Sequence, residues 1–261
     1  MGYRLAAVYA HPDDDTFGIG CVLARQGSDL RYTLVVATSG EAGEISDPSL
    51  ASEEDLARVR EAEELESLNV LGVRHPEVHF LRHPDGGLDQ VDRMELVEGV
   101  SGILAVARPE VVATFGPEGI TRHPDHIAIG QAATQAFHDA RAAGANGAFH
   151  RLFYNALPES ELERYWQALR EHGVDRGSAD ESMAPRGVPD HTITATVDCT
   201  ADVGRKLDAI RAHRTQANEL AGIPEDLIEP LVAREWFVQA WPPVVEPRGP
   251  ALADLFEGLE G

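Results

Sequence analysis

The sequence predicts an α/β protein in which helices cover both faces of a mostly parallel sheet. Short runs rich in β-branched residues alternate with amphipathic stretches, and this alternation is typical of such sheets. Of the 261 residues, 43% are hydrophobic, which is enough for a sizeable core. The sequence contains no apolar run near the ~18 residues of a membrane span. We therefore expect a globular chain rather than a disordered, fibrous or membrane-spanning one.

The expected elements can be placed along the chain. Strands are expected at residues 4–10, 32–37, 78–81, 111–115, 152–156 and 192–197. Helices are expected at residues 52–71, 94–107, 125–141, 159–171, 201–214 and 224–239. The first of these helices is the clearest, because Ser52 suits an N-cap and Gly72 follows its end. The polar stretch 173–189 contains Gly and Pro, which predicts a long loop or lid.

Composition limits the partners and the compartment. The chain has 22 Lys and Arg against 44 Asp and Glu, a net charge of −22, which disfavours nucleic acid and anionic membranes and leaves a small molecule as the expected partner. There is no secretory signal pattern, and Cys21 and Cys199 are expected to be reduced core thiols of a cytoplasmic protein. We expect one domain, residues 1–261, with a core at 1–145 completed by 146–261. A homo-oligomer is compatible with the sequence.

Two polar clusters follow predicted strands. HPDDD at residues 11–15 comes directly after the first strand, and HPDH at residues 123–126 comes after the fourth strand and a Gly-rich turn. Both clusters lie at carboxyl ends of strands, where open α/β sheets bind their ligands. Proline suits the first position of a helix. We therefore expect first helical turns at Asp13, Asp14 and His126, and a cap at His123.

The crowding of these side chains predicts a divalent metal. Three carboxylates at residues 13–15 would repel one another unless a cation lay between them or water solvated them fully. Imidazole and carboxylate donors without cysteine favour zinc, with iron(II), cobalt or manganese as alternatives. A lone His-Pro-Asp is usually a capping turn, and we interpret His83-Pro84-Asp85 in that way. The other two clusters differ because they converge on one crevice.

The two motifs resemble those of the PIG-L/LmbE-like family of zinc-dependent N-acetylglucosamine deacetylases. The matching segments are AHPDDD at 10–15, GPEGITRHPDHIAIG at 116–130, TSGEAGE at 38–44, VREAEELESLNVLGV at 59–73, RHPDGGL at 82–88 and KLDAIRAHRTQ at 206–216. The resemblance implies a Rossmann-like fold and deacetylation of an amino-sugar conjugate. It also implies that zinc is bound by His11, Asp14 and His126, that Asp13 is the general base, and that His123 is the electrophilic or acid partner.

The chemistry of these residue types fits the implied roles. Zinc held by one carboxylate and two neutral imidazoles keeps an open position, lowers the pKa of a bound water and polarises a carbonyl. Asp13 neighbours a ligand without needing to bind the metal, so it can move a proton from water to the leaving amine. His123, one helical turn from His126, can stabilise an oxyanion.

Substrate contacts are expected from several further side chains. The resemblance places Arg60 where an arginine reaches substrate hydroxyls or phosphate; the alternative is an i,i+4 pair with Glu64. It places Asp85 near the sugar; the alternative is an ordinary turn aspartate. Glu41 follows the second strand and should border the pocket.

Three residues depart from the family pattern. Asp15 stands where Glu is more common, a change that should leave ligation intact. Thr121 and Arg122 replace a Tyr and a Gly, and the missing Tyr argues against a mycothiol-type substrate. Arg122 is expected either to hold a phosphate or carboxylate of the substrate or to pair with Glu118.

Two other functions stay open from the residues alone. An iron(II) oxygenase also uses two His and one carboxylate, and oxygen consumption with an oxoacid cosubstrate would favour it. A binding or regulatory protein that holds metal without turnover would bind zinc tightly and hydrolyse nothing. Asp13 beside a ligand suits hydrolysis, which we therefore expect.

Overall fold

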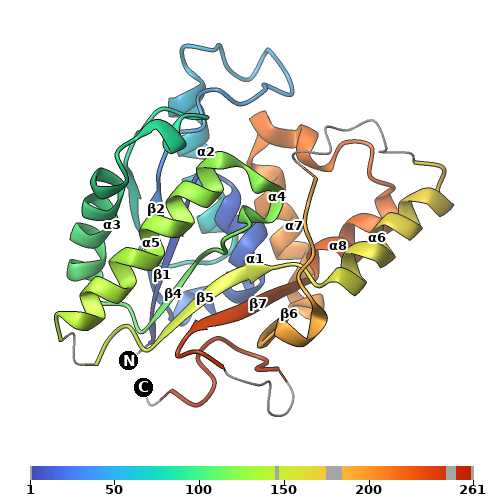
Figure 1. The fold of residues 1–261 in the computed structure, drawn as a ribbon. Helices are drawn as coiled ribbons and strands as arrows, with labels where there is room; N and C mark the ends of the chain where they lie inside the picture. Colours follow the sequence, from blue (N-terminus) through green and yellow to red (C-terminus); the bar gives the residue numbers. More distant parts are fainter. Residues whose placement is uncertain (1, 145–146, 175–183, 245–250, 260–261) are drawn as a thin grey trace.

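A computed structural model describes residues 2–144, 147–174, 184–244 and 251–259 of the chain. The strands within these residues are β1 (Arg4–Tyr9), β2 (Arg31–Val36), β3 (Glu77–Phe80), β4 (Val111–Phe115), β5 (Arg151–Ala156), β6 (Ala195–Asp198) and β7 (Arg234–Trp241). They form one sheet in the order β3-β2-β1-β4-β5-β7-β6 (Figure 1). Strands β1 to β5 are parallel, whereas β7 is antiparallel to β5 and β6. The predicted mostly parallel α/β fold is confirmed.

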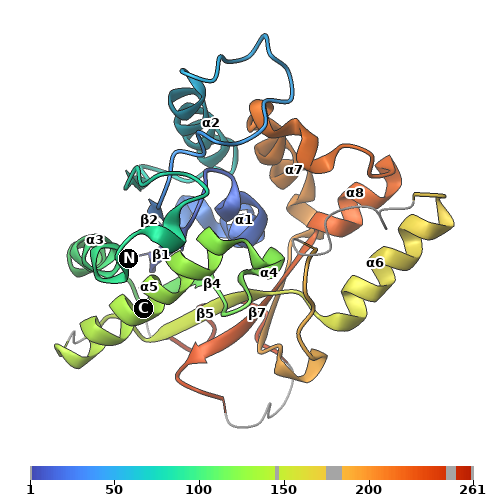
Figure 2. The ribbon, with the colours of Figure 1, turned by 45° about the horizontal axis from the view of Figure 1, so that its top comes forward.

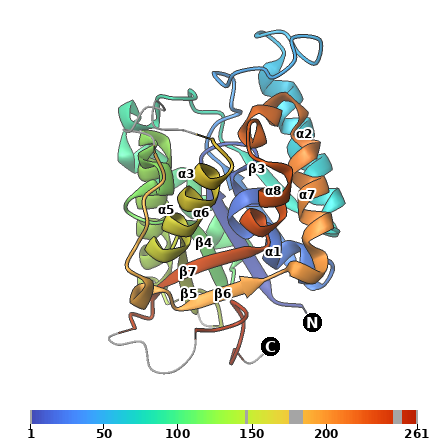
Figure 3. The ribbon, with the colours of Figure 1, turned by 90° about the vertical axis from the view of Figure 1, so that its right-hand side faces the viewer.

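Helices cover both faces of this sheet. Their bounds are α1 (Asp14–Gln26), α2 (Leu56–Val70), α3 (Arg93–Ala107), α4 (Gly119–Arg122), α5 (Pro124–Ala142), α6 (Glu159–Glu171), α7 (Val203–Ala212) and α8 (Glu225–Val232). Figure 3 shows α3 and α5 on one side of the sheet and α1, α2 and α7 on the other. The central strands are buried almost throughout, as parallel strands with two covered faces must be. None of the helices in the described part of the chain has the length and hydrophobicity to span a bilayer.

Some predicted elements were wrong or began elsewhere. The helix expected at 224–239 ends at Val232, and the rest is β7, whose pairing with β5 and β6 outweighs its helical pattern. Helix α2 begins at Leu56; Ser52 Oγ accepts the N–H of Asp55, as an N-cap side chain would, but the residues between them form a turn that precedes the helix. Pro12 lies before α1, which starts at Asp14, while Pro124 opens α5 as expected. Part of the expected loop at 173–189 lies outside the described residues.

The expectation of reduced thiols was also wrong, because Cys21 and Cys199 form a disulfide bond. Cys21 lies on α1 and Cys199 directly after β6, both are buried, and 178 positions separate them. Two cysteines so far apart form no recognisable motif, so the sequence does not indicate that they pair. The bond ties α1 to the edge of the sheet that carries β6.

The order of the strands brings the two polar clusters together. Strands β1 and β4 are parallel neighbours in the middle of the sheet, so their carboxyl ends lie at the same edge. The chain leaves β1 towards β2 on one side and returns as β4 on the other, which makes this edge a topological switch point. In Figure 2, α4 and the adjoining end of α5 lie near α1 at this edge. Residues 11–15 and 123–126 therefore face one crevice.

Candidate active site

Three side chains from the two motifs bring donor atoms close together. His11 Nδ1 lies 3.3 Å from His126 Nε2 and 3.5 Å from Asp14 Oδ2. His126 Nε2 lies 3.4 Å from Asp14 Oδ1. A tetrahedral ion about 2.0–2.1 Å from each donor separates its donors by about 3.3–3.4 Å. The three residues therefore fit a small tetrahedral cation.

The other nitrogen of each of these imidazoles has a partner that orients the ring. His11 Nε2 lies 3.1 Å from Asp85 Oδ1 and 3.4 Å from Asp125 Oδ2. His126 Nδ1 lies 2.9 Å from the carbonyl oxygen of Gly119. Gly119 has a φ of 61°, and a Cβ there would lie 3.0 Å from the Cβ of His126, so glycine permits this approach. Such partners fix which ring nitrogen carries the hydrogen, and they leave the lone pairs of His11 Nδ1 and His126 Nε2 to bind a metal ion.

Asp125 links three segments around this cluster. It is fully buried, and its carboxylate accepts the N–H groups of Gly86 and Leu88 at 2.8 and 3.0 Å in addition to facing His11. Sequence reasoning gave Asp125 no role, although it lies between two histidines of the second motif. Its position is typical of a carboxylate that orients a metal-binding histidine.

His123 caps α5, as predicted, and this fixes its ring. Its Nδ1 accepts the N–H of Asp125 at 3.2 Å, so in the neutral ring the hydrogen sits on Nε2. The ring centre lies 4.9 Å from that of His11 and 5.1 Å from that of His126. Nitrogens of these three histidines are close enough to form an alternative metal site, and so are His11, Asp85 and Asp125. The structure thus offers His123 two roles, ligand or proton donor.

Burial and neighbouring charges set the protonation states in the cluster. Burial lowers the pKa of His126, and nearby His11 adds to this effect. Burial and the two neighbouring histidines likewise lower the pKa of His123. Burial would raise the pKa of Asp14, but His126 and His11 outweigh it and hold the pKa well below its usual range. Burial opposes the charged form of His11, but Asp125, Asp14 and Asp85 outweigh it and raise the pKa of His11 well above its usual value. The cluster therefore has neutral imidazoles at His123 and His126 beside the ionised Asp14, and His11 must release a proton when a metal ion binds.

Asp13 lies just before α1 and is held from α2. It is buried, and its Oδ2 accepts from Arg60 Nη2 at 3.0 Å. Arg60 is only 4% exposed, and its guanidinium also donates to the carbonyl oxygens of Pro12 and Gly40. In the structure, the partners of the Arg60 guanidinium are therefore protein groups around Asp13. Contact between Arg60 and substrate stays a prediction. Glu64, which the sequence suggested only as a pair for Arg60, accepts the N–H of Asp13 at 2.9 Å.

The remaining expected contact residues lie around the crevice. Glu41 Oε1 accepts the N–H of Asp85, and Asp85 Oδ2 accepts the N–H of Ala42, both at 2.9 Å, so two loops are joined there. Asp85 also reaches His11, a contact that neither sequence interpretation of Asp85 included. Arg122 directly precedes His123 and is half-buried, with a φ of 62°. Substrate contact by these three residues stays a prediction.

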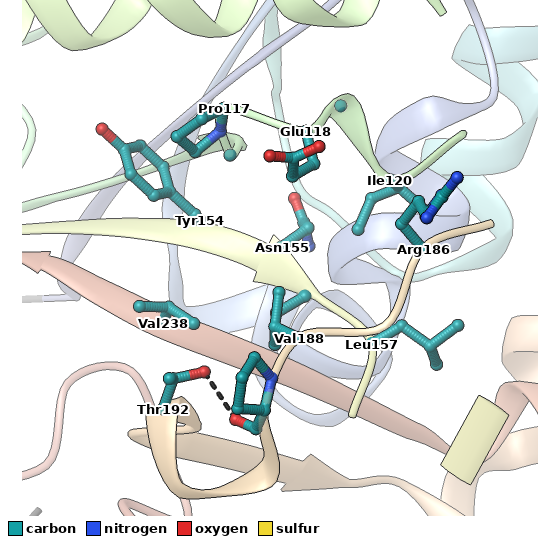
Figure 4. Close-up of a pocket in the computed structure, with 14 residues that line it drawn as sticks. Pro117, Glu118, Ile120, Tyr154, Asn155, Leu157, Arg186, Val188, Thr192 and Val238 are labelled. Atoms are coloured by element: carbon teal, nitrogen blue, oxygen red, sulfur yellow. Dashed lines mark hydrogen bonds between the residues drawn. The ribbon is translucent and has the colours of Figure 1, made fainter. Parts of the chain in front are cut away.

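A cavity of about 250 Å³ adjoins the loop that leads into the second motif. One wall is Gly116–Ile120, which includes the carbonyl that orients His126. Figure 4 shows Glu118 and Ile120 on one side and Leu157 and Val188 on the other. Most of the lining is apolar, with Glu118 and the exposed Arg186 as charged groups. Arg186, Val188 and Pro189 of the stretch expected as a loop or lid line this cavity, whereas Glu41, expected to border the pocket, does not.

An open α/β sheet with an imidazole–carboxylate cluster at its switch point is an arrangement typical of metal-dependent enzymes. Residues 6–137, half of the chain, match the family model described as PIG-L, GlcNAc-PI de-N-acetylase. The chain belongs to this family, whose members hydrolyse an amide bond with the help of a metal ion. The family resemblance seen in the sequence is thereby confirmed.

Curated relatives match over nearly the whole chain. A 1D-myo-inositol 2-acetamido-2-deoxy-alpha-D-glucopyranoside deacetylase of Saccharomonospora viridis is 34% identical, covering 97% of this chain and 99% of its own. The enzyme of the same description from Streptomyces scabiei is 30% identical, covering 100% of this chain and 91% of its own. Among solved structures, the conserved protein TT1542 from Thermus thermophilus superposes with a TM-score of 0.61 at 25% identity, covering 95% of this chain and 99% of its own.

Proposed function

We propose that the protein is a zinc-dependent N-deacetylase that removes the acetyl group from an N-acetylglucosamine conjugate or a related amino sugar. The observation that carries the proposal is the close approach of three side chains. His11 Nδ1 lies 3.3 Å from His126 Nε2, and these nitrogens lie 3.5 Å from Asp14 Oδ2 and 3.4 Å from Asp14 Oδ1, respectively. In this proposal these three residues are the zinc ligands. Neutral imidazoles and one carboxylate suit zinc better than a hard oxygen-seeking cation.

The roles of the surrounding residues follow from their positions. Zinc, when bound, lowers the pKa of a water and polarises the amide carbonyl. Asp13, next to a ligand in sequence, takes a proton from the attacking water and gives it to the leaving amine. Arg60 donates to the carboxylate of Asp13 and orients it. His123 carries its hydrogen on Nε2 and donates it as a hydrogen bond to the developing oxyanion.

The substrate class is proposed from the relatives and from the departures in this chain. The curated relatives act on an N-acetylglucosamine joined to inositol. This chain keeps the cluster but has Thr121 and Arg122 before the second motif. A cationic side chain there favours a conjugate that carries a phosphate or carboxylate over a neutral one.

The test is acetate release from a panel of substrates. The purified protein with one equivalent of zinc should release acetate from at least one N-acetylglucosamine conjugate, and an Asp13→Ala variant should not. The panel should include N-acetylglucosaminyl-inositol, a neutral alkyl glycoside and an anionic conjugate. Failure on all of these together with turnover of a different amide class would show that the proposed substrate class is wrong.

A further inference from the structure

Helix α2 presents a polar face to the first motif, although this face is buried. Its buried polar side chains are Arg60, Glu63, Glu64 and Ser67. Such groups are seldom buried, because removing them from water costs free energy unless they find partners. Glu64 is 0% exposed, and its partners lie in the segment that carries Asp13. The cost of burying Glu64 is therefore offset by contacts with the segment that carries Asp13.

The main chain of Asp13 has an unusual conformation that must be held in place. Its φ is 108° and its ψ is −28°, in a region that side chains other than glycine rarely adopt. Strained backbone of this kind persists only where the surroundings determine it. Glu64 Oε2 accepts the N–H of Asp13 at 2.9 Å, and Arg60 Nη2 contacts its carboxylate at 3.0 Å. Two residues one helical turn apart thus fix the main chain and the side chain of Asp13.

The two oxygens of the Glu64 carboxyl group differ in their partners. The carboxyl group of Glu64 lies beside that of Asp15, whose Oδ2 accepts from the hydroxyl of Tyr32 at 2.9 Å. Among the described residues, no hydrogen-bond donor reaches Asp15 Oδ1 or Glu64 Oε1. Glu64 Oε2, which accepts from the N–H of Asp13, is therefore the oxygen of this buried carboxylate that has a donor.

We propose that Glu64 is a positioning residue that holds Asp13 in the backbone conformation from which its carboxylate reaches the attacking water. The inference rests on the proposed function, in which Asp13 is the general base. A misplacement of about 1 Å in a catalytic geometry costs on the order of 10²-fold in rate. Loss of Glu64 should consequently appear in kcat rather than in KM or in metal binding.

The experiment compares two substitutions at this position. Glu64→Leu removes the acceptor for Asp13, whereas Glu64→Gln keeps an oxygen for Asp13 and offers an N–H to Asp15. We expect Glu64→Leu to lower kcat about 10–100-fold, with KM and zinc content essentially unchanged, and Glu64→Gln to stay close to the wild type. If Glu64→Leu does not fold, Glu64→Met takes its place, since it has similar length and no strong acceptor.

Glu63→Leu provides a matched control. Glu63 lies next to Glu64 on α2 and is similarly buried, but its carboxylate accepts from Thr215 N and Oγ1, at 3.0 and 2.6 Å, rather than from Asp13. Glu63→Leu should lower thermal stability and leave kcat unchanged at temperatures where the variant is folded. An equal loss of kcat in the Glu63 and Glu64 variants would overturn the proposal.

A double-mutant cycle separates positioning from general stability. In an Asp13→Ala background, Glu64→Leu should have no further effect on the residual rate, because the group it positions is gone. The proposal would be overturned by a further loss of rate in the Asp13→Ala background or by an unchanged kcat in Glu64→Leu alone. It would also be overturned if Glu64→Gln were as slow as Glu64→Leu. If the wild type releases no acetate at all, the proposed function fails instead. Crystal structures then decide the positioning: φ of Asp13 should stay positive in Glu64→Gln and leave that range in Glu64→Leu, and an unchanged φ in Glu64→Leu overturns the proposal.

Discussion

His123 and His126 lie one turn apart at the start of α5 but have different surroundings. The Nδ1 atom of His123 accepts a main-chain N–H, whereas that of His126 faces a carbonyl oxygen. In neutral rings this leaves a hydrogen on Nε2 of His123 and a lone pair on Nε2 of His126. The helix terminus and the preceding loop thus give two identical side chains opposite capacities, one to donate a proton and one to bind a cation.

The different surroundings of these side chains predict two groups of single substitutions, those that lose zinc and those that keep zinc but lose turnover. His11→Ala, Asp14→Ala and His126→Ala should each lose zinc, because a site with three protein ligands has no spare donor. Asp13→Ala and His123→Ala should keep zinc and lose roughly 10²–10⁴-fold in turnover. Metal analysis after dialysis, together with kcat, tests this division. Loss of zinc from His123→Ala would move His123 into the ligand set.

Arg122 predicts a preference among substrates. Arg122→Gly should raise KM for anionic amino-sugar conjugates about tenfold or more, as loss of a charge-assisted hydrogen bond would, and leave neutral conjugates unchanged. Glycine accepts the φ of 62° without strain, so the fold should tolerate this change. Steady-state kinetics on matched neutral and anionic substrates measure the effect. Equal changes for both kinds, or none, would exclude an anion-binding role.

For single residues, the sequence shows which residue types gather in a motif better than it shows what each side chain contacts. The two motifs can be found because carboxylates and histidines cluster at strand ends. The contacts of Asp125 and Glu64 cannot, since they depend on loops and a helix that are distant in sequence. For the same reason the sequence suggested an i,i+4 partner for Arg60, while the structure places its guanidinium against Asp13.

At the scale of elements, α1 carries Asp14 at its first turn and Cys21 two turns later. The disulfide to Cys199 therefore fixes the helix that presents the first motif. A cross-link that closes so long a loop mainly restricts the unfolded chain. The buried Lys206 side chain lies beside it, with Nζ 3.7 Å from Cys21 Sγ and 2.6 Å from Glu235 Oε1.

The disulfide predicts a measurable contribution to stability. Cys199→Ala should lower the free energy of unfolding by about 2–5 kcal/mol. Urea unfolding measures this loss, and a dithiol reductant should lower the midpoint of the wild type but not that of the variant. If the wild type unfolds at the same midpoint with and without reductant, the bond does not contribute in solution.

The elements that could be predicted are those whose local pattern and tertiary pairing agree. Strand β4 and helix α6 were placed with their observed bounds, because buried β-branched residues and a regular amphipathic pattern leave one choice. Strand β7 was missed because Arg234–Trp241 follows a helical segment without a break, and only pairing with β5 and β6 makes it a strand. Pairing of this kind is not visible within a sequence window.

For the whole molecule, His213 predicts an acid-dependent loss of stability. It is 3% exposed, and burial, with help from Arg60, lowers its pKa to about 3. In the unfolded chain the pKa is about 6.5, so between these values the unfolded state binds a proton that the folded state does not. Stability should thus fall as pH falls, by about 2 kcal/mol for this group between pH 7.5 and pH 5.

The contribution of His213 can be isolated by difference. Urea unfolding of the wild type and of His213→Gln at both pH values cancels the other titrating groups. Glutamine keeps a polar group towards Thr16, which lies 3.2 Å from His213 Nε2. The variant should lose less stability on acidification than the wild type. Parallel pH dependence of the two proteins would show that His213 is not buried in its neutral form.

The cavity and the proposed metal and acid–base residues draw on different parts of the chain. All of the proposed ligands and acid–base groups lie between residues 11 and 126, whereas Leu157, Val188 and Val238 on the far wall of the cavity come from later elements. Substitutions at these later positions can therefore reshape the cavity without altering any residue of the proposed metal and acid–base set.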